Sequence, residues 1–140
     1  MIVLRPYSKP LEAAGMDKSG DFYFEDFPWT TVPGWTVRSG YPNTVITSNG
    51  IVVSGSGPAT IRFLVRRVSS ATTNDVPSRI MVNGVQQGAD EFWDNNATEK
   101  TRSVTLADGD VITLMVEDTG STIDNNNTLT TGTYVIVEPV

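Results

Sequence analysis

The sequence predicts an all-β protein, an antiparallel β-sandwich of jelly-roll type with about eight strands and an extended N-terminal arm. Residues 103–117 are the clearest observation, because apolar and polar residues alternate on both sides of a short polar connection, as in half-buried strands. Two Asn-Gly pairs, at 49–50 and 83–84, suit the positive-φ positions of hairpin turns. No segment after residue 30 has a convincing helical period. These patterns indicate short strands joined by tight turns.

The chain divides into an N-terminal arm, residues 1–27, and a β-sandwich domain, residues 28–140. A length of 140 residues fits a single domain. Pro6 and Pro10 break the opening apolar run, and residues 11–16 offer at most one helical turn before glycines interfere. We therefore expect the arm to lie outside the sandwich.

The strands follow in order after residues 32–37, which enter the domain. Each is a β-branched or alternating run that ends at Asn, Asp, Gly or a polar loop. The eight expected strands are residues 44–47, 51–54, 59–68, 79–82, 85–87, 103–106, 111–117 and 134–138.

The composition excludes several kinds of chemistry. The chain has no cysteine and no histidine, which removes disulfides, thiolate and imidazole metal ligands, and Ser-His-Asp or Cys-His catalysis. Its formal net charge of −6 at pH 7 disfavours a nucleic-acid partner, because phosphate backbones are also negative. No run approaches the roughly 18 apolar residues that span a bilayer, and the opening residues lack a secretory pattern. We expect a protein made in the cytoplasm, without membrane insertion.

Five aromatic residues crowd into residues 21–29, interleaved with acidic side chains. They predict either a filled end of the domain's own core or an anchor that docks on a neighbouring subunit, since aromatic side chains are enriched at interface hot spots. With the larger apolar residues of the arm they form the candidate interface, which comprises Leu4, Tyr7, Leu11, Phe22, Tyr23, Phe24, Phe27 and Trp29.

Three acidic residues, Asp90, Glu91 and Asp94, lie beside Trp93. Paired carboxylates near aromatic rings are typical of glycosidases, where they supply acid and base. A solvated loop between strands explains the same residues more simply. We expect no catalytic residue here.

Asp108 and Asp110 flank a glycine in the connection of residues 103–117. Carboxylates are ligands that calcium accepts, but aspartate is also favoured in turns for local hydrogen bonding. We expect neither a metal nor a cofactor. Four arginines form a candidate basic strip on one sheet, with salt bridges to the acidic surplus as the simpler interpretation: Arg62, Arg66, Arg67 and Arg79.

Tyr41, Phe92 and Trp93 are the candidate contacts for a glycan. Flat rings beside amide and carboxylate groups suit stacking on sugars and hydrogen bonding to them. The alternative is that these rings cap the core or contact a sister subunit.

A series of loose motifs runs in order from residue 28 to the end of the chain. They are residues 28–36 (PWTTVPGWT), 41–45 (YPNTV), 50–55 (GIVVSG), 80–85 (IMVNGV), 106–116 with the Asp-Gly-Asp turn, and 132–135 (GTYV). In this order they resemble the small β modules of minor tail proteins from bacteriophages that infect actinobacteria. The pair of strands in residues 103–117, with a late aromatic strand, also resembles the C1q and tumour-necrosis-factor jelly rolls.

These resemblances imply a non-enzymatic structural protein of the virion, with a minor tail protein as the expected role. A capsid decoration protein that stabilises the head lattice, and a carbohydrate-binding module that contacts the host envelope, are the alternatives. The expected partners are tail or major capsid subunits, together with further copies of the chain, because C1q-like and TNF-like folds usually form trimers. We expect attachment through the arm, so that deletion of residues 1–20 leaves a folded domain that no longer enters particles.

Overall fold

The fold is an antiparallel β-sandwich, as the sequence predicts. The structure is a computed structural model and describes residues 8–24, 28–68, 75–94, 96–118 and 128–140. These residues form fourteen strands and no helix, more strands than the eight expected. Since the described residues contain no helix, they contain no helical segment that could cross a membrane.

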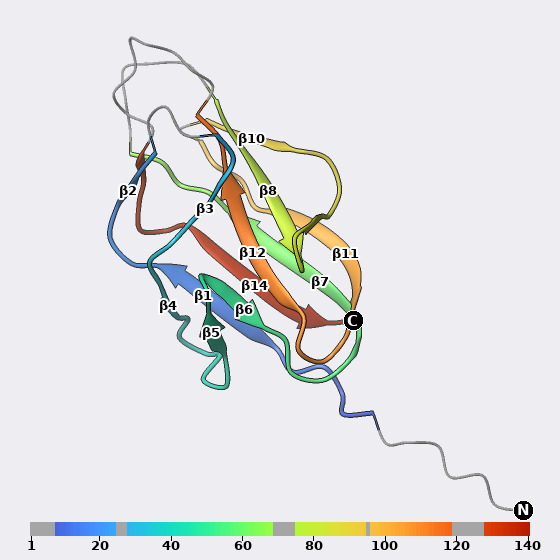
Figure 1. Ribbon diagram of the computed structural model, residues 1–140. Helices are drawn as coiled ribbons and strands as arrows, with labels where there is room; N and C mark the ends of the chain where they lie inside the picture. The colour runs from blue at the N-terminus through green and yellow to red at the C-terminus, as the bar shows by residue number, and fades with distance from the viewer. Residues whose placement is uncertain (1–7, 25–27, 69–74, 95, 119–127) are drawn as a thin grey trace, which may run out of the picture.

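Two sheets make the sandwich, and they lie one in front of the other in Figure 1. The five-stranded sheet has the order β11 (Lys100–Leu106), β7 (Gly57–Leu64), β14 (Tyr134–Pro139), β1 (Ala14–Lys18) and β4 (Trp35–Val37). The seven-stranded sheet has the order β10 (Glu91–Trp93), β8 (Val76–Val82), β12 (Val111–Val116), β6 (Gly50–Val52) and β5 (Val45–Thr47), with β3 (Thr30–Thr31) on β12 and β9 (Val85–Gln86) on β8. A small third sheet pairs β13 (Thr128–Leu129) with β2 (Phe22–Tyr23).

The core fills the space between the two large sheets. Alternate residues of β7 and β14 point inward from one sheet, and alternate residues of β12 point inward from the other, as the two-residue period of a strand requires. The largest fully buried side chains include Trp93, Phe24, Phe63, Met16, Ile61, Ile112 and Leu114. A single hydrophobic cluster therefore joins both sheets.

The first described residues belong to the sandwich, which differs from the expected boundary at residue 27. Residues 14–18 form β1 instead of a helical turn, and β1 lies between β14 and β4 with hydrogen-bonded neighbours on both sides. Met16 is fully buried, and Leu11 and Phe24 are also in the core. The glycines at 15 and 20 disfavour a helix here. Only the pairing with the last strand of the chain identifies the segment as an interior strand of the sheet.

The two halves of residues 103–117 lie in different sheets. β11 pairs with β7, whereas β12 pairs with β8, β6 and β3. The connection through Gly109, which has a φ of 87°, therefore crosses from one sheet to the other. The alternation of the sequence predicts both strands, but their partners come from distant segments.

Both Asn-Gly pairs occur at hairpin turns, with different registers. Asn83 and Gly84 occupy the two positive-φ positions between β8 and β9, as expected. Between β5 and β6 the positive-φ residues are Ser48 and Asn49, and Gly50 begins the next strand. A Cβ at Gly50 would lie 2.7 Å from the carbonyl oxygen of Ile112, so close packing against β12 requires this glycine.

Candidate functional site

The candidate interface residues separate into three groups in the structure. Leu4, Tyr7 and Phe27 lie outside the described residues. Phe22 stacks on the buried Phe24 with a centroid distance of 5.8 Å, and both belong to the domain's own core region. The remaining members are Leu11, which is buried, Tyr23, which is exposed, and Trp29, which is half-buried.

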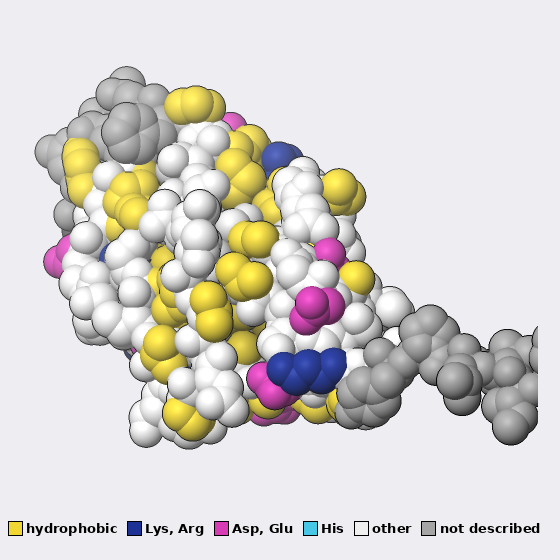
Figure 2. Space-filling model, turned by 60° about the horizontal axis from the view of Figure 1, so that its bottom comes forward, with side chains coloured by type: hydrophobic (Ala, Val, Ile, Leu, Met, Phe, Trp, Pro, Cys, Tyr) yellow, Lys and Arg dark blue, Asp and Glu magenta, His cyan; other side chains and the backbone are white. Residues whose placement is uncertain are grey.

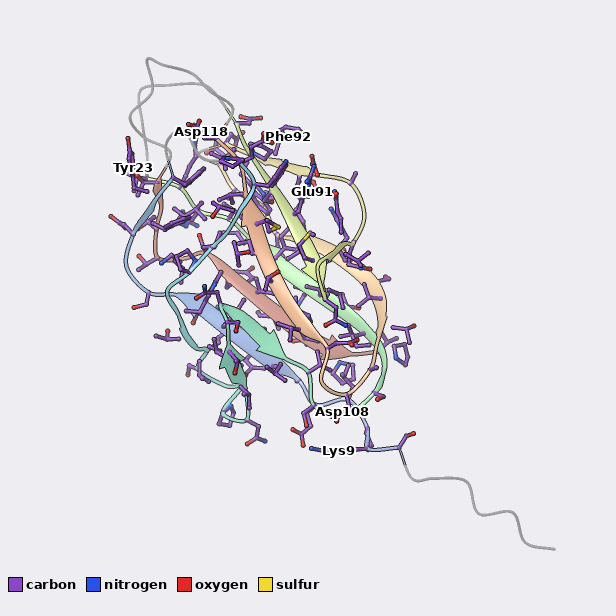
Figure 3. All side chains as sticks on the ribbon, viewed as in Figure 1. Lys9, Tyr23, Glu91, Phe92, Asp108 and Asp118 are labelled. Carbon is purple, nitrogen blue, oxygen red and sulfur yellow. The ribbon has the colours of Figure 1, made fainter. Side chains whose placement is uncertain are left out.

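The three candidate glycan contacts do not come together. Trp93 is only 1% exposed, and its indole nitrogen donates to the Ser78 hydroxyl at 2.5 Å. Phe92, the preceding residue, points the other way and is 59% exposed at one end of the sandwich (Figure 3). Tyr41 donates its hydroxyl to Glu138 on the outer face of the five-stranded sheet. A strand's alternation explains why two adjacent aromatics have opposite environments.

Each carboxylate near Trp93 has its own local partner. Asp90 accepts two hydrogen bonds from Arg79, at 2.7 and 3.3 Å, and Glu91 accepts one from Arg102 at 2.8 Å. Asp94 accepts the backbone N–H of Asn96, as in a local turn. The Arg79 guanidinium holds the pKa of Asp90 below its usual range. These contacts are those of ion pairs and a turn.

The connection at residues 107–110 is also held by hydrogen bonds, one within the turn and two to distant segments. Asp108 accepts the backbone N–H of Gly55, and Asp110 accepts from the Asn83 amide and the Ala107 N–H. Within the part of the chain that the structure describes, no group of three acidic residues could hold a metal ion. The expected basic strip does not form either, because Arg62 lies in the five-stranded sheet and Arg79 in the seven-stranded sheet.

Among the described residues, the outer face of the five-stranded sheet carries a connected set of seven polar side chains, which we call the outer network. Two carboxylates tie it together: Glu138 accepts from Tyr41 at 2.7 Å and from Arg62 at 2.8 Å, while Glu99 accepts from Arg62 at 3.3 Å and from Tyr134. The ion pair between Asp17 of β1 and Arg38, which follows β4, continues the set. The members are Asp17, Arg38, Tyr41, Arg62, Glu99, Tyr134 and Glu138.

Strand register explains how residues far apart in sequence meet in the outer network. Ile136 pairs with Gly15 on one side and with Arg62 on the other, and it is 2% exposed although it points away from the core. A Cβ at Gly15 would lie 3.1 Å from the Tyr41 ring and 3.2 Å from Arg38. The glycine thus leaves room for both side chains to lie over the sheet and cover Ile136.

The outer network shifts the pKa values of its members in opposite directions. The hydrogen bond from Tyr41, with help from Arg62, lowers the pKa of Glu138. That same hydrogen bond raises the pKa of Tyr41. Burial, together with the hydrogen bond to Glu99, raises the pKa of Tyr134 to about 12. The network therefore favours neutral tyrosines and charged carboxylates.

The shifts give a pH window for stability. A raised tyrosine pKa stabilises the fold below the unfolded value near 10.0, and this contribution is lost as pH rises through about 12. The lowered pKa of Glu138 stabilises the fold above the ordinary value of 4.5, and this contribution is lost as pH falls through the folded pKa. The network is most stabilising between these limits.

We predict that Tyr134→Phe removes a tyrosine whose pKa is raised to about 12. The change deletes the hydroxyl that Glu99 accepts and keeps the ring beneath Arg38, whose guanidinium carbon lies 4.5 Å from the centroid. Tyrosinate absorbance during an alkaline titration measures the change. The chain has four tyrosines, and the variant should lose the absorbance step of one of them at the high-pH end. Titration of all four tyrosines near 10 in the unaltered protein would contradict the geometry.

Sequence reasoning missed five members of the outer network: Asp17, Arg38, Glu99, Tyr134 and Glu138. Tyr134 and Glu138 share the outward face of the last strand, and Arg62 takes an outward position on the long strand β7. That alternation was a usable signal for polar, outward side chains. Their mutual contacts depend on β14 pairing with β7, which no local pattern encodes.

A small hollow lies beside Phe92, at the end of the sandwich opposite Lys9 and Asp108 (Figure 3). Its volume is about 120 Å³. The lining combines one exposed ring with hydroxyl, amide, carboxylate and ammonium groups, from Phe92, Trp93, Asp94, Asn96, Ala97, Thr98 and Lys100. Such a mixture suits a small polar ligand such as a sugar unit.

Comparison with known proteins shows the fold and no family. No protein-family model matches the sequence, and no curated protein matches it. The chain is similar to the structure of Eiger TNF from S. frugiperda, with a TM-score of 0.61, 10% identity and 94% coverage of each chain. It is also similar to a family 35 carbohydrate binding module from Clostridium thermocellum, with a TM-score of 0.41, 19% identity, and coverage of 87% of this chain and 100% of that one. The first likeness shows a TNF-like jelly roll.

Proposed function

We propose that this chain is a non-enzymatic structural protein of a bacteriophage virion, a jelly-roll module that serves as a minor tail protein. The proposal joins the resemblance of its ordered motifs to minor tail modules with the TNF-like fold of the whole chain. Virion proteins of this kind act through their surfaces, and so the faces and ends of the sandwich are the functional parts. A capsid decoration protein is the alternative within the same class.

The observation that carries the proposal is the place of those motifs in the fold. The motif of residues 28–36 contains β3 and most of β4, and that of residues 80–85 contains the β8–β9 turn. Residues 106–116 cross between the sheets, and residues 132–135 lead into the central strand β14. The motifs therefore mark the framework of the sandwich, which supports a shared module architecture.

The contacts of the acidic side chains support a non-enzymatic role. Asp90 and Glu91 form ion pairs with different arginines, and Asp94 caps a backbone N–H. A carboxylate pair that delivers acid and base needs one member with a raised pKa. The hydrogen bond from Arg79 lowers the pKa of Asp90, which is the opposite direction.

Self-association is part of the proposal, with a trimer as the expected state. The TNF-like fold supports it, because the jelly rolls that the sequence resembles usually form trimers. Light scattering of the purified chain tests it directly, since a trimer has three times the chain mass of 15.2 kDa. A single species of monomer mass at every concentration would contradict this part of the proposal.

Particle composition tests the virion role. We expect the chain in purified bacteriophage particles, and antibody labelling or cryo-electron microscopy should find it around the tail axis. Labelling at threefold or sixfold positions of the shell would assign it to decoration instead. Its absence from particles that are otherwise complete would refute both placements.

We still propose attachment through the N-terminal segment, but the segment now ends before residue 9 and not at residue 27. Residues 9–12 are tied to residues 54–56 by backbone hydrogen bonds, for example from Glu12 to Ser54 and from Ser56 to Lys9. The chain therefore enters the sandwich at this end, beside the start of β7 (Figure 1). We therefore place the proposed attachment before residue 9, because residues 9–12 are already bonded to the sandwich.

Carbohydrate binding to the host envelope is the second candidate, favoured by the hollow beside the exposed Phe92. Binding of envelope glycans should then be lost in Phe92→Ala and retained in Val85→Ala, since Val85 is 62% exposed and does not line the hollow. Equal binding by the two variants would remove this candidate.

A further inference from the structure

The two Asn-Gly pairs, at 49–50 and 83–84, carry a reactive chemistry as well as a turn preference. In deamidation, the backbone nitrogen of the residue after asparagine loses its proton to solvent and attacks the carbon of the side-chain amide. Glycine favours this step because it has no side chain to hinder the approach. Ammonia leaves as the new carbon–nitrogen bond closes a succinimide ring. Water then opens the ring to give aspartate or isoaspartate, so the reaction needs no other co-reactant.

The two pairs differ in whether the glycine nitrogen is free to react. Thr47 and Gly50 form the pair that closes the β5–β6 hairpin, so the Gly50 N–H is hydrogen-bonded across it. Gly84 instead lies inside the β8–β9 turn, where it is exposed and its N–H has no hydrogen bond to any described residue. A Cβ at Gly84 would meet nothing within 4 Å. Of the two pairs, Asn83-Gly84 therefore presents the free nitrogen.

The side-chain amide of Asn83 is held by the connection that crosses between the sheets. Its Nδ2 donates to the Asp110 carboxylate at 2.8 Å, and its Oδ1 accepts the backbone N–H of Val111 at 2.9 Å. We call these two hydrogen bonds the Asn83 clamp. Ring closure requires the amide carbon to turn toward the Gly84 nitrogen and Nδ2 to leave as ammonia. The clamp must therefore open before the reaction can occur.

Asn49 is protected in the opposite way. Its side chain is exposed, and the structure shows no hydrogen bond from it to a described residue. Its glycine is the buried partner, because Gly50 packs against the Ile112 carbonyl of β12. Reaction at Asn49 thus requires the start of β6 to leave the sheet, whereas reaction at Asn83 requires two surface hydrogen bonds to open. Local opening of the smaller kind costs less free energy.

We infer that Asn83 is a site of spontaneous deamidation and that the Asn83 clamp sets its rate. The inference is independent of the proposed virion role. Water reaches the site, since Asn83 is exposed and Asp108 of the same connection lies at an end of the sandwich (Figure 3). Figure 2 brings that end forward and shows acidic side chains on its surface. The product adds a negative charge opposite Asp110, and repulsion between the two carboxylates keeps the clamp open.

Peptide mapping by mass spectrometry during incubation at mildly alkaline pH tests the inference, because it reports conversion at Asn83 and at Asn49 separately. Asp110→Ala removes the acceptor of Nδ2 and should raise the rate at Asn83 about tenfold, as expected for loss of a hydrogen bond to a charged group. Asp108→Ala is the matched control, because it changes the same connection without touching the clamp. A synthetic peptide of residues 80–87 gives the rate without a clamp.

Conversion at Asn83 that rises in Asp110→Ala alone, with Asn49 unchanged, supports the inference. Asp110→Asn is the milder variant, because it keeps an oxygen acceptor without the charge, and it should give an intermediate rate at Asn83. Equal acceleration at both asparagines in both Asp110 variants would assign the effect to unfolding and overturn the inference. It would also be overturned by a parent rate at Asn83 equal to that of the peptide, or by no acceleration in Asp110→Ala.

Discussion

Deleting residues 1–20 is expected to unfold the protein, not to release an intact domain. The deletion removes β1 from between β14 and β4, leaving two strands of the five-stranded sheet without their hydrogen-bonded partner. It also removes Leu11, Ala14 and Met16 from the core. A Met→Ala change in a core alone costs about 2–5 kcal/mol, and a whole domain is stable by about 5–15 kcal/mol. Loss of a central strand therefore exceeds what the fold tolerates.

Circular dichroism and thermal unfolding measure this result. The truncated chain should lack a cooperative transition, and Met16→Ala in the full chain should lower the free energy of unfolding by about 2–5 kcal/mol. Deletion of residues 1–7 is the matched control, because it shortens the N-terminus but keeps every described residue, β1 included. A cooperatively folded chain without residues 1–20 would show that β1 is dispensable and would restore the wider arm boundary.

Trp93→Ala is expected to destabilise the fold by about 3–5 kcal/mol, the usual cost of removing a large aromatic side chain from a core. Trp93 contacts the Phe63 ring edge to face at a centroid distance of 5.7 Å, so the change leaves a cavity between the sheets. It also leaves the buried Ser78 hydroxyl without the indole donor. The melting temperature should fall by roughly 10 °C.

Phe92→Ala is the matched control, because it changes the neighbouring aromatic residue on the opposite face of β10. An exposed position should alter the free energy of unfolding by no more than about 0.5 kcal/mol. Chemical denaturation of the two variants measures the difference. Equal stabilities would mean that Trp93 is not a core residue and would return it to the candidates for ligand contact.

Much of the sandwich could be predicted from local patterns. The strand of residues 134–138, the pair within residues 103–117 and the Asn83-Gly84 turn all occur where expected, because alternation and positive-φ preferences act within a few residues. The short strands β2, β3, β10 and β13 were not expected. Strands of two or three residues contain less than two full alternations, so their sequence carries no period to read.

The candidate site was less accessible to sequence reasoning. Tyr41, Phe92 and Trp93 share a residue class, and nothing local shows that one is buried, one exposed and one bonded to a carboxylate in the last strand. The outer network draws on four or more segments. Its members become neighbours only through strand order.

By itself, the sequence determined the all-β class, most strand positions, the turn residues and the excluded chemistries, since these depend on composition and on contacts between near neighbours. Only the tertiary structure decided that β1 lies inside the five-stranded sheet, that β11 and β12 belong to different sheets, and that residues from distant segments meet in the outer network. The physical reason is that a two-residue period fixes which side chains share a face. It does not fix which strand lies alongside, because that depends on how the whole chain best buries its apolar side chains.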